Sequence, residues 1–524
     1  MKTKNITIYD STLRDGAQTK GIAFSLQDKL RITEVLDNFG VDYIEGGWPG
    51  ANPTDDEFFK KLPPLKKSKL CAFGMTRKDG KSAENDPGLN AVLNSGASSA
   101  CIVGKTWDFH VLKALKVSLD KNLNMINDTF EYASKRLDEV MFDAEHFFDG
   151  YKLNPLYAKK TIKVALDAGA KWIILCDTNG GTLPHEISEI IADVSTIIPR
   201  EKLGVHFHND TDNATANSLE AVRNGVCQIQ GTFNGLGERC GNANLVNVVS
   251  NLCLKMKYKT NLNKNLKRMT YVSRFIDETL NRQSNRNLPF VGSAAFAHKG
   301  GLHISAVEKD PKSYEHINPE SVGNQRVLVV SNQSGRSNIV NQLKKLKINF
   351  GNDNKKLSAF INLTKKQEFL GYAYDGAEAS FELLAKREFS NLKEFYSLES
   401  YKVSDERRKQ TSGKFVTISE ARLKIFVKGK EFFCVAEGNG PINALDIALR
   451  KALSHSYPKL VKLNLIDYKV RILTPKDGTK ALVRVRIESS NQRLKWSTIG
   501  VANNVIDASF IALHDSITFH LIKS

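Results

Sequence analysis

The chain has 524 residues, of which 41% are hydrophobic and 25% are charged, so we expect two to four globular domains rather than a single core. The formal net charge is +18, and residues 402–524 hold 22 Lys and Arg against 11 Asp and Glu. These basic residues are scattered and lack a nucleic-acid recognition motif. A solvated basic surface that attracts anionic small molecules is therefore favoured over a nucleic-acid binder.

The seven cysteines are an odd number without a Cys-x-x-Cys pair, which indicates a reducing compartment without disulfides or a zinc cage. Residues 1–5 lead directly into a strand-like run, and no signal segment follows them. No apolar stretch is long enough to span a bilayer, so we expect a cytoplasmic protein without a membrane partner.

The first half of the chain alternates short apolar runs with amphipathic helical patterns. Eight runs are predicted as strands: Ile6–Asp10, Tyr43–Gly47, Leu70–Met75, Ala100–Val103, Glu139–Phe142, Trp172–Asp177, Leu203–Phe207 and Gln228–Phe233. The helices predicted between them include Leu26–Phe39, Leu156–Ala168, Glu186–Ile198 and Ala214–Asn224. Apolar strands that alternate with helices indicate a parallel sheet covered on both faces. We therefore predict a (β/α)8 TIM barrel over residues 1–270. A doubly wound sheet is the alternative, but no Gly-x-Gly-x-x-Gly turn follows the first strand.

Polar residues gather after the predicted strands, where a TIM barrel carries its active site. The polar segments are Asp10–Gln18, Glu45–Pro49, Asp143–His146, Asp177–Gly180, His206–Asp210 and Asn234–Asn244. The N-terminal ends of the strands show no comparable clustering. The sequence therefore predicts an active site at one end of the barrel.

Two histidines of the seventh strand form the first candidate site. His206 and His208 are two residues apart, so their side chains point to the same side of the strand. This spacing suits two imidazoles that converge on one divalent metal. A hydrogen-bonded histidine pair at a strand end is the alternative.

Three motifs identify a family. They are Thr12-Leu13-Arg14-Asp15-Gly16-x-Gln18, His206-x-His208-Asn209-Asp210 and Gly237-Glu238-Arg239-x-Gly241-Asn242. Together they resemble the aldolase-type metallolyases, which include isopropylmalate, homocitrate and citramalate synthases and hydroxymethylglutaryl-CoA lyase. The resemblance implies a divalent metal held by Asp15, His206, His208 and Asn242. Such a mixed nitrogen and oxygen site suits Zn, Mn, Co or Mg.

The same resemblance implies roles for further residues. Arg14 would stabilise the oxyanion that forms when a keto acid is attacked, and a surface ion pair with Asp15 is the alternative. Gln18 and Thr178 would bind the substrate, with Thr178 on its carboxylate. Glu145 would belong to the base machinery, and a helix cap after the fifth strand is the alternative.

Two segments after the barrel, Phe296–His303 and Ser313–Asn324, resemble the subdomain that covers the barrel mouth in acyl-CoA-condensing synthases, usually that of the partner subunit. By this likeness His303 and Tyr314 are catalytic. His303 would be coupled to Glu145, because a carboxylate raises the basicity of an imidazole that removes a proton from acetyl-CoA.

The remaining chain is predicted as connecting subdomains over 271–405 and an α+β domain over 406–524, with Ser404–Gly413 as a linker. The predicted strands of the last domain are Val416–Ile418, Ala421–Val427, Glu431–Glu437, Val470–Leu473 and Ala481–Glu488, and its predicted helices are Ile442–Ser454 and Asn504–Lys523. This pattern resembles the C-terminal regulatory domain of isopropylmalate and citramalate synthases. The resemblance implies a homodimer and an end-product amino acid as effector; dimerisation without an effector is the alternative.

The segments Glu45–Pro53 and Phe142–Tyr151 are most similar to a bacterial branch of the citramalate synthases. That branch condenses pyruvate with acetyl-CoA on a route to isoleucine, which implies these two substrates and an isoleucine effector. A ketoisovalerate-specific isopropylmalate synthase, an acyl-CoA lyase and a non-enzymatic basic binding protein remain alternatives. A lyase of this family typically ends soon after the barrel.

Overall fold

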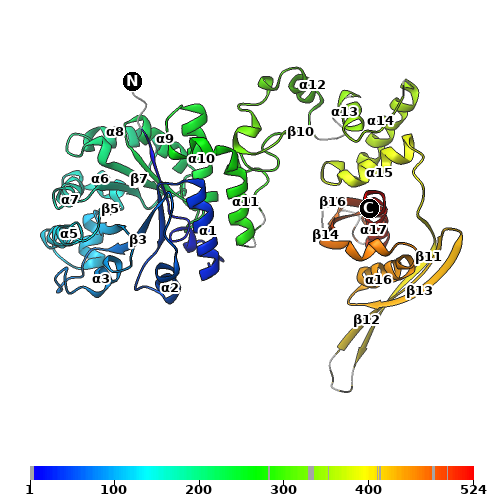
Figure 1. The fold of residues 1–524 in the computed structure, drawn as a ribbon, viewed down its shortest axis with the longest axis horizontal. Coiled ribbons are helices and arrows are strands. Elements are labelled where there is room, and N and C mark those ends of the chain that lie inside the picture. The colour runs from blue at the N-terminus through cyan, green and yellow to red at the C-terminus, as the bar shows by residue number, and fades with distance from the viewer. Residues whose placement is uncertain are drawn as a thin grey trace. The chain divides into compact units, whose positions relative to one another are not determined.

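The structure is a computed structural model that describes residues 5–280, 282, 284–328, 336–351, 353–409, 411, 413, 415–474, 478, 480–491 and 494–524. The chain forms two compact units. One comprises Met1–Phe296 with His316–Arg326, and the other comprises Ala297–Glu315 with Val327–Ser524. Figure 1 shows the elements of both units.

Eight parallel strands close into a barrel in chain order, which confirms the predicted TIM barrel (Figure 1). The strands are β1 Thr7–Asp10, β2 Tyr43–Gly47, β3 Lys69–Met75, β4 Ser99–Lys105, β5 Glu139–Glu145, β6 Trp172–Asp177, β7 Leu203–Phe207 and β8 Gln228–Gly231. The barrel closes where β1 pairs with β8, with Ile8 in register with Ile229.

Helices and short turns cover the barrel. They are α1 Leu26–Phe39, α2 Pro53–Lys61, α3 Pro87–Leu93, α4 Asp108–His110, η2 Val111–Leu115, α5 Leu119–Ala133, α6 Phe147–Leu153, α7 Pro155–Asp167, α8 Pro184–Val194, α9 Ala214–Arg223 and α10 Leu245–Ser250. Local sequence sets their ends. Ser25 and Asp28 form a capping box at the start of α1, and Gly40 ends it in the left-handed conformation that glycine adopts without strain.

Three barrel strands have C-terminal ends that differ from the prediction. β8 stops at Gly231 rather than Phe233, because Phe233–Gly235 forms a 3-10 turn, η4. β4 and β5 run two and three residues further than predicted, so Lys105 and Glu145 are the last residues of their strands. Polar residues at the mouth of a barrel can continue the strand ladder while their side chains face the site.

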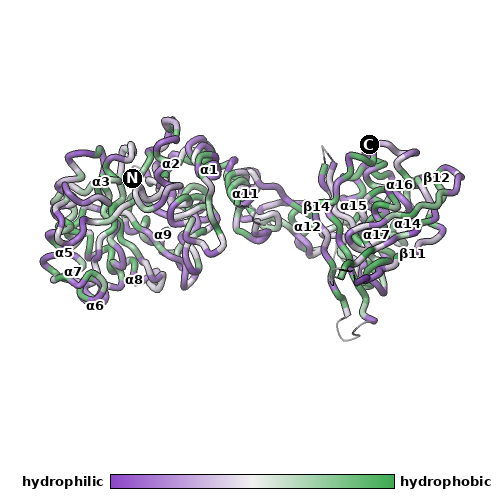
Figure 2. Tube along the Cα trace, turned by 90° about the horizontal axis from the view of Figure 1, so that it is seen from below, coloured by the Kyte–Doolittle hydropathy of each residue, from purple (hydrophilic) through white to green (hydrophobic). Residues whose placement is uncertain are grey.

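The barrel is filled by a layer of side chains distinct from the one between sheet and helices. The inner layer consists of Tyr9, Tyr43, Cys71, Phe73, Cys101, Met141, Ile174 and Cys176, all buried. Figure 2 shows hydrophobic and hydrophilic stretches alternating along the chain, as expected for elements with one buried face. The filled barrel leaves its C-terminal mouth as the place for a site.

The rest of the first unit packs beside the barrel. It contains the turns η5 Asn251–Lys255, η6 Asn261–Arg268 and η8 Pro319–Val322 and the helix α11 Met269–Thr279. The side-chain amide of Asn324 donates to the carbonyls of Phe290 and Gly292, which ties residues 316–326 to this unit.

The second unit begins with a small parallel pair and continues with helices. These elements are β9 Ala297–His298, α12 Gly301–Lys309, η7 Pro311–Ser313, β10 Val327–Leu328, α13 Arg336–Lys345, α14 Asn354–Phe369, η9 Tyr374–Gly376 and α15 Glu378–Phe389. Two antiparallel three-stranded sheets follow, each succeeded by a helix. They are β11 Tyr396–Lys409, β12 Phe415–Val427, β13 Lys430–Gly438 and α16 Pro441–Ser454, then η10 Pro458–Lys462, β14 Asn464–Ile472, β15 Val483–Ser490, β16 Lys495–Ala502 and α17 Val505–Lys523. The predicted α+β domain is confirmed, and the strands of both sheets pair antiparallel.

Predictions in this unit were wrong at two places, and two strands were missed. The linker at Ser404–Gly413 is mostly strand, because β11 continues to Lys409 and crosses the boundary expected after residue 405. The runs Val416–Ile418 and Ala421–Val427 form one strand, β12, rather than two. Neither β11 nor β16 was predicted as a strand. Charged residues on an exposed ribbon mimic a linker, because both faces of such a ribbon can meet water.

The helix α17 is long and apolar enough to cross a membrane by length and composition, so the expectation that no apolar stretch reaches that length was wrong. In the structure it packs against β15, β16 and α15, and 61% of its apolar window is buried. Its Asp515 accepts hydrogen bonds from Ser380 and Arg387 of α15. These contacts are those of a core helix.

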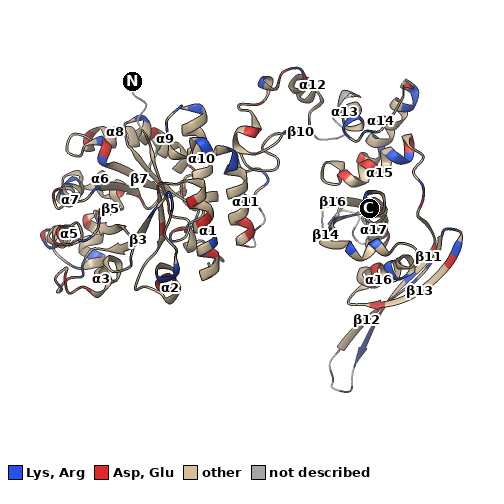
Figure 3. Cartoon of the chain, in the orientation of Figure 1, with Lys and Arg blue, Asp and Glu red and all other residues tan. Residues whose placement is uncertain are grey.

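Charged residues of both signs are interspersed along the elements of each unit (Figure 3). The ribbon β11–β12 carries pairs such as Arg422 with Glu420 and Lys424 with Glu399. Basic residues that are interleaved with acidic ones in this way form a solvated surface rather than a continuous basic stripe.

Candidate metal centre

A cavity of about 330 Å³ opens at the C-terminal mouth of the barrel. This volume falls in the range of small-molecule sites. Seven of the residues predicted for the site line it: Arg14, Asp15, Gln18, Glu145, Thr178, His206 and His208. They lie at or after the C-terminal ends of β1, β5, β6 and β7, with Gln18 in the turn η1, Gly16–Gln18, so the fold brings together segments that are far apart in the sequence.

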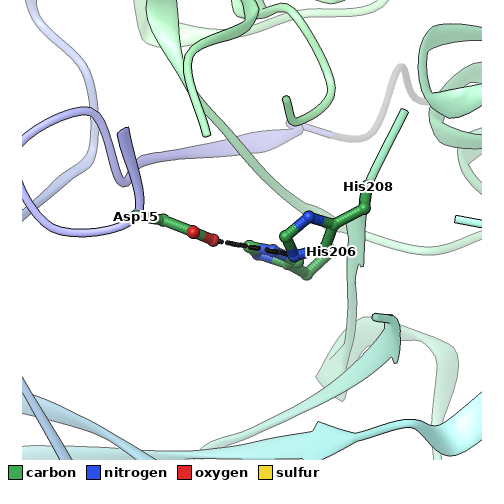
Figure 4. Close-up of side chains that lie close together, drawn as sticks. All are labelled: Asp15, His206 and His208. Carbon is green, nitrogen blue, oxygen red and sulfur yellow. Dashed lines mark hydrogen bonds and ion pairs between the residues drawn. The ribbon is translucent and has the colours of Figure 1, made fainter. Parts of the chain in front are cut away.

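Asp15, His206 and His208 converge on one point (Figure 4). The Asp15 Oδ2 atom lies 3.1 Å from His206 Nε2 and 3.9 Å from His208 Nε2, and the two Nε2 atoms are 3.4 Å apart. All three side chains are buried. Two imidazole nitrogens and a carboxylate oxygen that face each other at this spacing form a set of ligands for a divalent cation.

Gln230 on β8 fixes the orientation of His206. The His206 Nδ1 atom lies 3.2 Å from Gln230 Oε1, and that oxygen can only accept a hydrogen bond. Nδ1 therefore carries a hydrogen, and in the neutral imidazole the Nε2 lone pair faces the centre. This is how proteins usually prepare a histidine for a metal.

The charges of the three residues depend on one another. Burial raises the pKa of Asp15, but Arg14 and His206 lower it well below its usual range. Burial lowers the pKa of His206, but the Asp15 carboxylate raises it above the ordinary value. Burial together with His206 lowers the pKa of His208 to about 4. Near neutral pH His208 is therefore neutral and able to ligate a cation.

Three buried polar atoms at this centre find no hydrogen-bond partner among the described residues: Asp15 Oδ1, His208 Nδ1 and Asn242 Oδ1. Asn242 lies beside His208, because the two residues form a backbone bridge, and its amide nitrogen donates to the Leu236 carbonyl. Its oxygen is therefore left for another partner. Buried polar atoms without partners are costly, so their grouping fits a bound cation.

Arg14 is held rigidly beside this centre. Its Nε donates to Glu45 Oε2 at 2.8 Å, its guanidinium lies 3.9 Å above the Phe73 ring, and one nitrogen is 3.8 Å from Asp15 Oδ2. Burial disfavours the charged form, but the carboxylates of Glu45 and Asp15 raise the pKa of Arg14 above its usual range. Glu45 also accepts hydrogen bonds from Tyr9 and Ser11, so it anchors neighbouring segments.

Glu145 and Thr178 lie between Asp15 and His206 in the sequence, Glu145 at the end of β5 and Thr178 directly after β6. Glu145 pairs with Lys105 of β4, and Thr178 accepts a hydrogen bond of 2.9 Å from the backbone N–H of His146. His146 adopts a left-handed backbone conformation, which turns the chain from β5 into α6. Both predicted substrate and base residues therefore face the cavity.

Four polar or thiol residues that line the cavity received no individual role from the sequence: Lys105, Asp143, Cys176 and Glu238. The alternation of side chains along a strand could have identified two of them. Lys105 follows Cys101 and Val103 at intervals of two along β4, and Asp143 precedes Glu145 by two along β5. The lining carboxylates of Asp15, Asp143, Glu145 and Glu238 outnumber the cations Arg14 and Lys105 by two. This excess of negative groups also favours a bound divalent cation.

His303 and Tyr314 belong to the second unit, on α12 and after η7. Their rings stack with centroids 4.1 Å apart. The structure thus places the two predicted catalytic residues together. Their coupling to Glu145 remains a prediction.

Three family models match the chain in succession. The HMGL-like model matches residues 5–276, the homocitrate synthase post-HMGL domain-like model matches residues 290–367, and the LeuA allosteric (dimerisation) domain model matches residues 375–521. These matches correspond to the barrel, the helical connection and the two antiparallel sheets with their helices.

Relatives match over nearly the whole chain. The (R)-citramalate synthase of Aquifex aeolicus (strain VF5) is 50% identical over 99% of this chain and 98% of its own. The (R)-citramalate synthase of Geobacter sulfurreducens is 47% identical with the same coverage. The 2-isopropylmalate synthase of Pseudoalteromonas atlantica is 29% identical over 98% of this chain and 95% of its own.

Proposed function

Because the chain belongs to the (R)-citramalate synthase family, we propose that it condenses pyruvate with acetyl-CoA to give (R)-citramalate and free CoA. The observation that carries the proposal is the identity of 50% over nearly the full length, against 29% for an isopropylmalate synthase. The enzyme is thus an acyltransferase in which the acetyl group becomes an alkyl group of the product.

We propose that Asp15, His206, His208 and Asn242 hold the divalent metal ion. Their facing ligand atoms and the buried oxygen atoms without partners support this assignment. Such an ion supplies a Lewis acid for the keto acid. Zn, Mn, Co and Mg all fit a mixed nitrogen and oxygen ligand set.

The chain's own residues perform the remaining steps. Thr178 and Gln18 would bind the keto acid, with the Thr178 hydroxyl donating to its carboxylate. Glu145, coupled to His303, would take a proton from the acetyl methyl group, and the resulting carbanion would attack the keto carbon. The keto oxygen then gains a negative charge beside Arg14. Tyr314 would orient the substrate or return a proton. Hydrolysis of the thioester by water finally releases the CoA thiol.

We propose that the second unit dimerises the enzyme and binds isoleucine as a feedback effector. The match to an allosteric dimerisation domain supports the dimer, and the route to isoleucine supports the effector. All seven cysteines are free thiols, which agrees with action in the cytoplasm.

The test is the release of free thiol from acetyl-CoA with pyruvate, ketoisovalerate, ketobutyrate or ketoglutarate, with and without a chelator. We expect a strong preference for pyruvate that chelation abolishes and metal restores. A preference for ketoisovalerate would assign the enzyme to leucine synthesis instead. Release with none of the four would overturn the proposed condensation.

A further inference from the structure

Lys105 is the second cation of the cavity and has no role in the chemistry described above. It is the last residue of β4 and lies in register with Glu145, the last residue of β5. The Lys105 Nζ atom donates to Glu145 Oε2, and both side chains are about a quarter exposed and face the cavity. The carboxylate of Glu145, the proposed base, therefore forms an ion pair with the Lys105 ammonium group.

The surroundings fix this pair in place. The side-chain amide of Asn122 donates to the Lys105 carbonyl at 2.9 Å, and the Thr106 hydroxyl donates to the Glu145 carbonyl at 2.7 Å. Asn122 is buried and also bonds Tyr157. The backbone of both residues is thus anchored, and the ion pair between their side chains lies at the cavity wall.

Two oxygen atoms gain negative charge during the proposed condensation, and the described lining of the cavity carries two cationic side chains, Arg14 and Lys105. Arg14 is tied to Glu45 and lies beside Asp15, where the keto oxygen of pyruvate would be. The thioester oxygen of acetyl-CoA gains charge earlier, when its methyl group loses a proton. We propose that Lys105 stabilises this enolate oxygen by donating a hydrogen bond from its ammonium group. The inference rests on the proposed function and adds a catalytic residue to it.

Bond geometry supports the assignment. In an acetyl thioester the carbonyl oxygen lies about 2.4 Å from the methyl carbon. A base that approaches the methyl group therefore lies close to that oxygen as well, and a donor bonded to the base can reach it. In the step, a C–H bond breaks, the proton moves to the Glu145–His303 base, and the electron pair forms the C=C bond of the enolate. The charge then resides on the thioester oxygen, beside the Lys105 ammonium, which keeps its protons.

The test compares Lys105→Met, Lys105→Arg and the matched control Lys113→Met, an exposed lysine of the same segment. We expect Lys105→Met to lower kcat about 100-fold, as the loss of one donor to a developing oxyanion does. The isotope effect with trideuterated acetyl-CoA should rise, because proton removal becomes slower than the later steps. Lys105→Arg should recover part of the loss, and Lys113→Met should behave as the wild type. Pyruvate affinity and metal affinity, measured by calorimetry, should be unchanged in all three.

The contrary outcomes are distinct. If the wild type releases thiol with pyruvate and Lys105→Met keeps more than half of its turnover, the role of Lys105 is wrong and the proposed function stands. A loss of pyruvate affinity that accounts for the lower turnover would also overturn it. So would borohydride trapping of pyruvate on Lys105, since an imine would then be its chemistry. If the wild type releases no thiol from acetyl-CoA in the presence of a keto acid, the proposed function and the role of Lys105 are both wrong.

Discussion

At the scale of single residues, the candidate metal centre depends on a side chain that would not touch the ion. Gln230 accepts a hydrogen bond from His206 Nδ1, which leaves Nε2 without a proton in the neutral ring. Gln230 is buried on the strand next to His206, in register with it. The amide thus selects the tautomer that binds metal.

We expect Gln230→Leu to weaken metal binding about 10–100-fold, because the ring loses the partner that orients it. Competition with a chromogenic chelator measures the affinity directly. Gln228→Leu is the matched control, since this glutamine is buried on the same strand and its amide approaches the Met141 sulfur at 3.8 Å. If both variants lost affinity equally, the effect would come from barrel packing and not from the His206 tautomer.

A site residue could be predicted from the sequence where the strand that carries it was given the right length, because alternate side chains along a strand face the same side. His206 and His208 were predicted because their strand was bounded correctly at Leu203–Phe207. Lys105 was missed because the predicted strand stopped at Val103, one inward position too early. The partner of an ionisable group was also beyond prediction, because the pairing of Lys105 with Glu145 depends on register between neighbouring strands.

At the scale of elements, a buried carboxylate joins α1 to the start of β3. Asp37 on α1 accepts hydrogen bonds from the backbone N–H groups of Lys66, Lys67 and Ser68 at 2.8–3.0 Å. Burial raises the pKa of Asp37, but these three donors lower it below its usual range. The charged carboxylate therefore stabilises the junction of helix and strand.

We expect Asp37→Asn to destabilise the barrel by about 1–3 kcal/mol at neutral pH, because at least one buried N–H loses its acceptor. The folded-state pKa lies below the unfolded value, so the stabilisation by Asp37 is present above that value and is lost as the pH falls through the folded-state pKa. The difference in melting temperature between variant and wild type should therefore shrink in acid. Faster hydrogen exchange at residues 66–68 would locate the effect.

The control for that experiment is Asp167→Asn, because Asp167 is exposed and pairs only with Lys163 among the described residues. Its removal should change the free energy of unfolding by less than about 0.5 kcal/mol. A difference in melting temperature between Asp37→Asn and wild type that stays constant across the acid range would contradict the assigned charge.

Element boundaries in general were predicted best where a cap marks them, as Ser25 and Gly40 do for α1. They were predicted worst on the exposed ribbon of β11 and β12.

At the scale of the whole molecule, the order of the domains was predictable, because strand–helix alternation ends with the barrel and a different pattern begins after it. What a periodic pattern does not encode is which copy of the chain completes a site. His303 and Tyr314 lie outside the unit that holds the metal candidates. Leu302, which lies beside His303 in the sequence, is 85% exposed.

We expect His303 to act on the barrel of the partner subunit, and mixing two inactive variants tests this. Asp15→Asn removes a proposed metal ligand from the barrel. His303→Ala removes the proposed catalytic histidine from the segment that is expected to cover the barrel mouth, called the lid here. If the lid acts across a two-fold dimer, half of the mixed dimers' sites combine an intact barrel with an intact lid, and random mixing of subunits restores about a quarter of wild-type activity. If His303 instead served its own barrel, every site in every dimer would lack one of the two residues. The mixture would then stay as inactive as each variant alone, however long the subunits exchanged.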